Sequence, residues 1–364
     1  MKNTEIKQLI GKYSLNMSID EYEEFFDFIA NKPDDPNEDL WTENILEFSK
    51  VVKNHLGNEK AIKFLTSAYE EFLTNYPNSF HNKVNILRST CYLQMEEKKL
   101  EEAHKTMNRY LYNALGQVKF TQNLPKMHYY SFRGVSDYTI DEIKNEKISL
   151  SHPRMFNDPL DTILVWWLEN EIKAKGGGNE PEMRFRLLMK KASEHIKLRC
   201  LIGSKYYEGD KWQDRKVEDL SVLMWAHYAN SHTGICIEYK FDNKFFKTRT
   251  LTNEEELVMI APMEYVQKID LSSEVPSMKK ALFTKSNFWN YENEMRLCFY
   301  NVNDSNDFPE IDCKGAIKAV YLGVKCSDEN KRKVEKAIGD KDIPLYQMEV
   351  DQELLTRLKK KQIG

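Results

Sequence analysis

Apolar residues recur at intervals of three and four over residues 16–115, a spacing that predicts amphipathic helices. The pattern is clearest in the segments Ile45–Leu56 and Asn58–Asn78. The segment Val84–Leu115 predicts two further helices, joined across Glu96–Lys99. We therefore expect the first part of the chain to form helical hairpins.

The character of the sequence changes at Gly116–Lys126, where a glycine closes the last helix and polar residues follow. A chain of 364 residues exceeds the size at which one core grows easily, so we expect two domains, residues 1–120 and 121–364. The helix pair with small residues at Cys91 and Ala103 resembles a tetratricopeptide-type repeat. We expect this first module to sense a trigger or to hold a protein partner.

Beyond residue 126, short β-favouring runs alternate with helical segments and long connections. Strands are expected at Met127–Arg133, Ile148–Ser151, Cys200–Ser204, Gly234–Tyr239, Leu257–Ala261, Met295–Tyr300, Ala319–Gly323 and Leu345–Val350. Helices are expected at Asp137–Lys147, Leu220–Tyr228, Ser277–Asn287 and Asp328–Ile338, and from Asp158 onward. A regular doubly wound series fits this spacing poorly. The predicted fold class is α+β: a helical N-terminal hairpin module followed by a mixed, mostly antiparallel sheet with packed helices.

Composition and charge narrow the functional classes. Hydrophobic residues make up 41% of the chain, which is enough for real cores, and the 53 basic and 57 acidic residues are interspersed, so nucleic acid is not indicated as a partner. No window approaches the roughly 18 apolar residues that span a bilayer, so we expect a cytoplasmic protein without a membrane partner. The six cysteines form no C-x-x-C pair, and we expect them to be reduced and to bind no metal.

The segment Leu223–Glu238 concentrates His227, His232 and Tyr228 just before an expected strand. The two histidines are five positions apart and no further residue follows at a spacing typical of metal ligands. A zinc site, a structural hydrogen-bonding role and a place in a ligand pocket all remain open at this point.

A second candidate lies in the segment Phe288–Arg296. If the strand there begins by Glu292, alternation along the strand places Glu292, Glu294 and Arg296 on one face. An ion-pair ladder on the surface is the alternative reading. Aromatic residues flank these charges on both sides, which favours partial burial and therefore a functional reason for the charges.

A third candidate consists of polar residues at the ends of the first two expected strands. Arg133 precedes Gly134 in a turn and has no evident structural role. Ser151 ends the second strand, and Asn157 and Asp158 follow closely, with Asp158 suited to cap the next helix.

Five ordered motifs resemble the bacterial family known as domain of unknown function 2971. They are Tyr129–Arg133, Ile148–Asp161, Met224–Glu238, Lys285–Arg296 and Ile317–Gly323, and the resemblance covers about residues 127–350. Residues 1–120 lie outside it. The family name implies no activity.

The order of an arginine, a serine and a Glu-x-Glu at strand ends is also similar to the layout of ADP-ribosyltransferases. That resemblance implies that Arg133 holds NAD, Ser151 steadies the site, Glu294 is the catalytic carboxylate and Glu292 places the acceptor. The chain departs from the pattern in having His-Pro after Ser151. Further binding residues are then expected at Tyr130, Asn157, Asp158, His227, Tyr228 and Arg296.

Three functions follow as alternatives. The first is an NAD-consuming transferase or glycohydrolase, an effector of the kind found in toxins and phage defence, with NAD as substrate and no metal. The second is a non-catalytic module that recognises a nucleotide-like small molecule or a peptide. The third is a hydrolase or nuclease in which Asp158, Asp161, Glu292 and Glu294 bind Mg²⁺.

Overall fold

A computed structural model describes most of the chain as two compact units. The described residues are 37–76, 79–118, 127–156, 180–208, 211–246, 248–251, 254–268, 277–304, 306–354 and 356–363, with residues 8, 10, 158 and 161. One unit comprises residues 1–118, 164–194 and 276–279, and the other comprises residues 119–163, 195–275 and 280–364.

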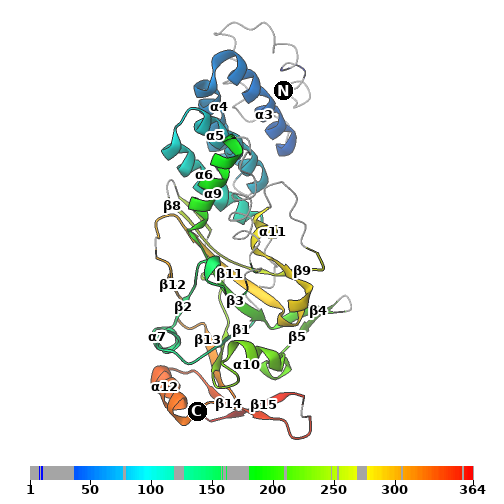
Figure 1. Cartoon of the computed structure of the whole chain (residues 1–364), viewed down its shortest axis with the longest axis vertical. Coiled ribbons are helices and arrows are strands. Elements are labelled where there is room, and N and C mark those ends of the chain that lie inside the picture. The colour runs from blue at the N-terminus through cyan, green and yellow to red at the C-terminus, as the bar shows by residue number, and fades with distance from the viewer. Residues whose placement is uncertain are drawn as a thin grey trace. The chain divides into compact units, whose positions relative to one another are not determined.

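The first unit is helical. Its first four labelled helices are α3 (Glu38–Leu56), α4 (Asn58–Asn75), α5 (Phe80–Glu96) and α6 (Leu100–Gly116), each packed against the next (Figure 1). The helix α9 (Glu180–Ser193) also packs on α5 and α6, because Phe185 stacks on Tyr92 with ring centroids 4.8 Å apart. A division at residue 120 assigns α9 to the second domain, whereas in the structure it belongs to the helical unit. No helix in the described part of the chain has the length and apolar character needed to cross a bilayer.

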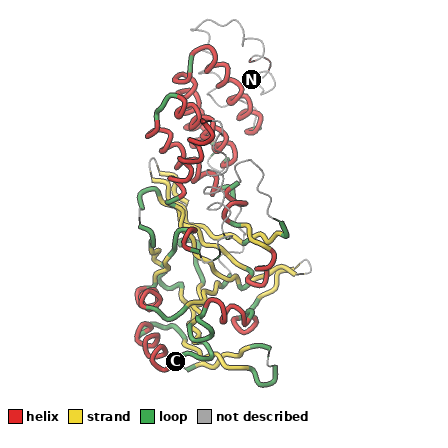
Figure 2. The backbone as a smooth tube through the Cα atoms, in the orientation of Figure 1, coloured by secondary structure: helices red, strands yellow, loops and turns green. Residues whose placement is uncertain are grey.

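The second unit is built on a nine-stranded sheet of order β15-β14-β13-β6-β1-β3-β11-β8-β7 (Figure 2). Its strands are β1 (Tyr129–Arg133), β3 (Ile196–Gly203), β6 (Ile235–Tyr239), β7 (Thr248–Leu251), β8 (Glu254–Pro262), β11 (Glu294–Asn301), β13 (Ile317–Leu322), β14 (Leu345–Val350) and β15 (Leu358–Gln362). All neighbours are antiparallel except β13 and β14. The predicted fold class, a helical module followed by a mixed and mostly antiparallel sheet, is thus confirmed.

Three smaller strand pairs lie outside this sheet: β2 (Lys147–Ser149) with β12 (Glu310–Asp312), β4 (Lys205–Glu208) with β5 (Lys211–Asp214), and β9 (Glu264–Val266) with β10 (Thr284–Ser286). Within the expected strand Ile148–Ser151, Ile148 and Ser149 therefore pair with β12, and Ser151 forms a bridge with Leu198 of β3 in the main sheet. The helix expected at Ser277–Asn287 is wrong in its second half. It is the short helix α11 (Met278–Leu282) followed by β10, because Thr284, Lys285 and Ser286 pair in parallel with β9.

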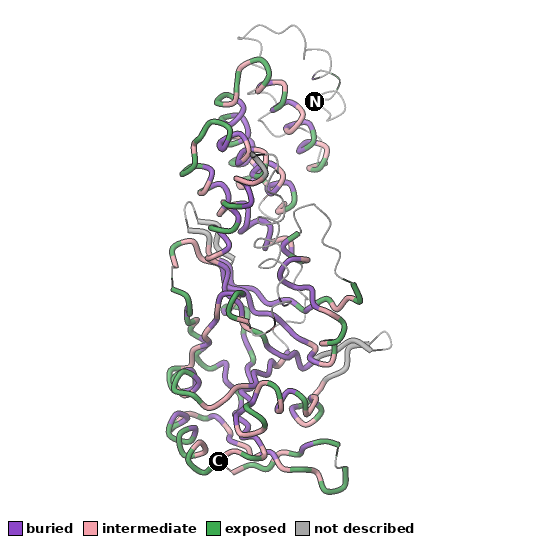
Figure 3. Tube along the Cα trace, viewed as in Figure 1, coloured by how far each residue is buried: buried purple, intermediate pink, exposed green. Residues whose placement is uncertain are grey.

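The main sheet packs helices on both of its faces. The helices α7 (Asp137–Asn145) and α12 (Asp328–Ile338) pack on one face, which we call the α7 face, and α10 (Val222–Tyr228) packs on the other, the α10 face. Alternation along the strands sends Tyr129, Leu201 and Leu297 into the α7-face core, and Tyr130 and Ile202 into the α10-face core. The central strands are buried on both sides (Figure 3).

Candidate functional site

The strand β11 places Glu294 and Arg296 on the α10 face of the sheet. Arg296 lies opposite Cys200 on β3, and Glu294 lies opposite Ile202. Glu292 is not part of this strand, because it ends the short 3₁₀ helix η4 (Asn287–Glu292) and is followed by Asn293 in a left-handed conformation with φ 47°. Glu292 is nevertheless turned toward Glu294, so the three charged groups converge although the expected strand start was wrong.

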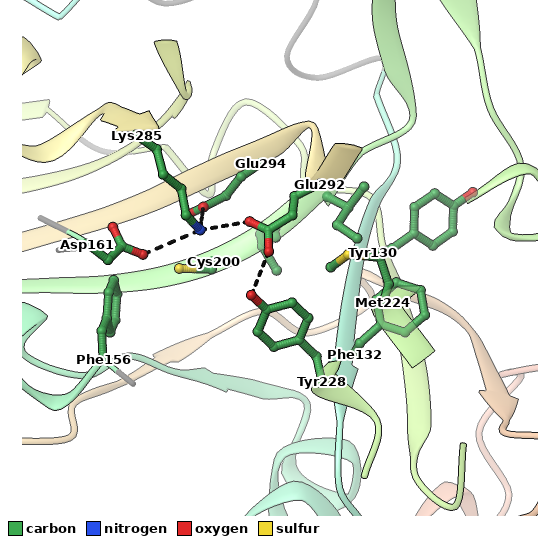
Figure 4. Close-up of a pocket in the computed structure, with 12 residues that line it drawn as sticks. Tyr130, Phe132, Phe156, Asp161, Cys200, Met224, Tyr228, Lys285, Glu292 and Glu294 are labelled. Carbon is green, nitrogen blue, oxygen red and sulfur yellow. Dashed lines mark hydrogen bonds and ion pairs between the residues drawn. The ribbon is translucent and has the colours of Figure 1, made fainter. Parts of the chain in front are cut away.

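Lys285 and Asp161 complete a buried cluster, which we call the acidic network: Asp161, Lys285, Glu292, Glu294 and Arg296. The Lys285 Nζ lies 2.7 Å from Glu292 Oε2, 3.1 Å from Glu294 Oε2 and 3.5 Å from Asp161 Oδ2 (Figure 4). The Arg296 guanidinium donates to Glu294 Oε1 at 2.7 Å and to Asp161 Oδ1 at 2.8 Å. Its third contact is the Leu282 carbonyl at 2.6 Å. Each cation thus bridges more than one carboxylate.

The network is almost completely removed from solvent. Arg296 is 0% exposed, Glu292 3%, Glu294 4% and Lys285 5%. A surface ion-pair ladder, the alternative reading of the Phe288–Arg296 segment, is therefore wrong. Charges this deep are costly unless they are paired and hydrogen-bonded, which these are.

The two neighbouring glutamates have opposite electrostatic environments. Burial raises the pKa of Glu292 above its usual range, and the contacts from Lys285 and Tyr228 offset this only in part. Burial acts in the same sense on Glu294, but the charges of Arg296 and Lys285 outweigh it and lower its pKa to about 2. Lys285 keeps its proton, because the three carboxylates around it raise its pKa despite burial. Glu292 is thus the member of the network best suited to exchange a proton.

Tyr228, the last residue of α10, connects this helix to the network. Its hydroxyl donates to Glu292 Oε1 at 2.5 Å. The chain then turns through Asn230–His232, whose φ angles are 47°, 54° and 70°, a left-handed run that costs roughly 1–3 kcal/mol per residue. The turn needs Gly234, because a Cβ there would lie 2.1 Å from the Arg133 carbonyl oxygen. The backbone is therefore strained directly after Tyr228, the residue that contacts Glu292.

A cavity of about 120 Å³ lies beside the network on the α10 face. The residues that line it are acidic, basic, aromatic, aliphatic and sulfur-containing: Tyr130, Phe132, Phe156, Asp161, Cys200, Leu201, Ile202, Met224, Tyr228, Lys285, Glu292 and Glu294 (Figure 4). A cavity of about 150 Å³ holds one benzene molecule, so this space suits a single small ring or part of one.

Arg133 lies on the opposite face of the sheet from Glu294. It forms an ion pair with the buried Glu142, which also pairs with Arg199 at 3.4 Å. Arg199 precedes Cys200 on β3, so the two side chains project from opposite faces. Arg133 therefore has a structural partner that the sequence did not reveal, and the expected meeting of Arg133 with Glu294 in one cleft is wrong.

Some of the other expected site residues line the cavity, and some do not. Tyr130 and Tyr228 line the cavity. Ser151 forms a backbone bridge with Leu198 on β3, and its side chain is not among those lining the cavity. His227 is exposed on α10 and also lies outside the lining. Asn157 and the helix expected from Asp158 onward lie outside the described residues, apart from Asp158 and Asp161 themselves.

The histidine, cysteine and acidic side chains were also examined as possible metal ligands, and the cysteines as possible disulfide partners. Within the described ranges, no three His, Cys, Asp or Glu side chains are grouped so as to hold a metal ion. All six cysteines are free thiols in the structure. Burial and the neighbouring Glu294 raise the pKa of the Cys200 thiol, so this group is protonated beside the network.

Lys285 and Phe156 are cavity residues that reasoning from the sequence missed, and Asp161 was considered only as a metal ligand. Lys285 stands in the same motif as Glu292, but one lysine in a chain with 30% charged residues carries no distinguishing signal. Asp161 meets Arg296 across 135 positions of sequence, a separation that no local pattern can bridge.

Comparison with known proteins supports the family resemblance and adds no activity. No curated protein and no solved structure matches the chain. Residues 224–297, which include most of α10, Lys285 and the Glu292–Arg296 part of the network, match the model of a family described as a protein of unknown function, DUF2971. The match lies within the region whose sequence motifs resemble this family, and it supports that resemblance over residues 224–297.

Proposed function

We propose that the cavity beside the acidic network binds a ring-sized cationic group of a nucleotide-like substrate, with NAD as the candidate, and that Glu292 transfers a proton in its cleavage. The observation that carries this proposal is the position of Glu292. Its carboxyl group is buried, lines the cavity, and is contacted by the Lys285 ammonium and the Tyr228 hydroxyl. A buried acid with a raised pKa at a cavity wall is a typical acid-base residue.

The charge of the network favours a cationic ligand. With every group ionised, the three carboxylates of Asp161, Glu292 and Glu294 exceed the two cations, Lys285 and Arg296, by one negative charge. A buried excess charge is costly, so either a proton on Glu292 or a cation in the cavity relieves it. The nicotinamide ring of NAD is flat, cationic and ring-sized, and the aromatic walls offered by Phe132 and Phe156 suit such a group.

The chemistry supported by this arrangement is cleavage of an N-glycosidic bond. The bond between the ribose C1′ and the nicotinamide nitrogen breaks, its electron pair stays with the nitrogen, and a water or acceptor oxygen bonds to C1′. Glu292 takes the proton from that oxygen. Carboxylates stabilise the oxocarbenium-like transition state of such reactions, and no metal is required.

The same geometry moves the proposed catalytic carboxylate from Glu294 to Glu292. Glu294 is paired with two cations, Arg296 and Lys285, whereas Glu292 is paired with Lys285 and with the neutral hydroxyl of Tyr228. Glu294 is therefore better suited to fix Lys285 and Arg296 in place. Arg133 and Ser151 are not part of this proposal.

A second candidate is a non-catalytic module in which the cavity only recognises its ligand. The pairing of every charged side chain within the network favours it, because side chains already held in ion pairs support binding without proton transfer. The Lys285 ammonium also occupies the centre between the carboxylates, which favours both metal-free candidates over a Mg²⁺ site.

Calorimetric titration of the full chain with NAD and with NADH tests the proposal, because the two molecules share sugars and phosphates but differ in the charge of the ring. We expect NAD to bind at least about tenfold more tightly, a difference of about 1.4 kcal/mol. The Glu292→Gln variant removes the excess negative charge and is expected to narrow this preference. Equal affinity for the two molecules, or a preference for NADH, would overturn the proposal.

A further inference from the structure

A larger groove lies in the same unit, and no residue that lines it lines the cavity beside the acidic network. It has a volume of about 830 Å³, within the usual range for small-molecule sites. Its walls come from residues 240–245, which follow β6, from residues 311–316, which begin in β12, from Lys318 of β13, and from His128, which precedes β1.

His128 is the residue of this groove that other side chains hold in a fixed arrangement. Its Nδ1 lies 2.5 Å from Glu238 Oε1 on the neighbouring strand β6. Tyr321 on β13 donates its hydroxyl proton to the other oxygen of Glu238. Burial would raise the pKa of Glu238, but the hydrogen bonds from His128 and Tyr321 outweigh it and lower the pKa, so Glu238 is a carboxylate.

This arrangement determines what the imidazole offers to the groove. A carboxylate at Nδ1 keeps a proton on that nitrogen and fixes the orientation of the ring. The Nε2 atom is then the ring nitrogen available to a ligand, and the His128 side chain is 35% exposed. This nitrogen can share a hydrogen bond with a phosphate group.

The remaining walls of the groove carry a positive excess. Four lysines, Lys240, Lys244, Lys314 and Lys318, stand against Asp242 and Asp312, an excess of two positive charges before His128 is counted. Both aspartates accept hydrogen bonds from backbone N–H groups two positions further along the chain. Asp242 accepts the backbone N–H of Lys244 at 2.8 Å, and Asp312 accepts that of Lys314 at 2.9 Å.

Two aromatic rings give the groove an apolar wall as well. Phe241 and Phe245 stack with ring centroids 4.1 Å apart, and both line the groove. We propose that the groove is a second ligand site, for an anionic small molecule with a phosphate group and a ring system. The phosphate contacts His128 Nε2 and the lysines, and the ring system packs on the side that carries Phe245. Glu238 and Tyr321 position His128 and do not touch the ligand.

Calorimetric titration of the full chain with AMP, adenosine and inorganic phosphate tests this site, since adenosine keeps the ring system and lacks the phosphate. We expect AMP to bind at least about tenfold more tightly than adenosine, and His128→Asn to weaken AMP binding by a similar factor. The matched control is His227→Asn, which changes an exposed histidine outside the groove and is expected to leave AMP binding unchanged.

The positioning role of Glu238 has its own readout. In ¹⁵N spectra of the histidine rings, Glu238→Gln is expected to shift the His128 nitrogens away from the Nδ1-protonated pattern and to weaken AMP binding. The proposal is overturned if AMP and adenosine bind equally well, if neither AMP nor phosphate binds at millimolar concentration, or if His128→Asn behaves like His227→Asn.

Discussion

Replacing Lys285 with methionine removes the positive centre of the acidic network while it keeps the length of the side chain. In the structure the Lys285 ammonium lies within 3.5 Å of Asp161, Glu292 and Glu294, and its loss leaves three buried carboxylates with Arg296 as their cation. Removing one partner of a buried ion pair costs about 3–5 kcal/mol. We expect Lys285→Met to lose stability within that range near neutral pH.

The change is measured as the melting temperature of the second unit by calorimetry. For a unit of roughly 200 residues, 1 kcal/mol corresponds to about 2–4 °C, so the expected decrease is roughly 6–20 °C. The decrease should shrink at mildly acidic pH, because Glu292 has a raised pKa and can take up a proton there. The matched control, Lys336→Met, changes an exposed lysine of α12 and should shift stability by less than about 0.5 kcal/mol. A Lys285→Met protein that melts like the control would refute the electrostatic account of the network.

Three further predictions concern the same unit. The pKa of Glu294 in the folded protein, about 2, lies below its ordinary 4.5. The ionised carboxylate therefore stabilises the folded protein fully above pH 4.5, and this stabilisation is lost as the pH falls toward 2. We expect acid titration to show a loss of about 3 kcal/mol that Glu294→Gln removes. Glu142→Gln leaves Arg133 and Arg199 without their shared carboxylate, so calorimetry should show a lower melting temperature, with NAD binding unchanged. Cys200 should be alkylated slowly at pH 7, because the pKa of its thiol is raised. Mass spectrometry should show that NAD slows the alkylation further, because Cys200 lines the cavity. Equal alkylation rates with and without NAD would mean that NAD binds elsewhere.

Much of the second unit could be predicted from local patterns. Strands such as β1 and β6 are rich in aromatic and β-branched residues, and their positions were expected. The edge strands β7 and β15 were missed, since a segment such as Leu358–Gln362 is mainly lysine and shows no apolar alternation. Charged residues of this kind are common at sheet edges, where they prevent pairing with other chains.

The candidate site was predicted only in part. The Glu292–Arg296 segment was recognised because its charges stand among aromatic residues, and the structure places all three of its charged groups in one buried network. Arg133 was assigned to the same site, although Tyr130 and Arg133 differ by an odd number of positions along one strand and so face opposite sides of the sheet. That error was avoidable from the sequence. The contributions of Asp161 and Lys285 depend on tertiary contacts and could not be predicted from the sequence.

Nicotinamide release from NAD by the full chain and two variants tests the central claim most directly. The Glu292→Gln variant brings the network to zero net charge and keeps its shape, so it should melt like the unaltered protein while it releases nicotinamide at least about 100-fold more slowly. Glu142→Gln, a buried glutamate on the α7 face, should melt at lower temperature but keep its rate at temperatures where it stays folded. No nicotinamide release by the unaltered chain, or equal release by the Glu292→Gln variant, would contradict the assignment of Glu292 as the proton-transferring residue.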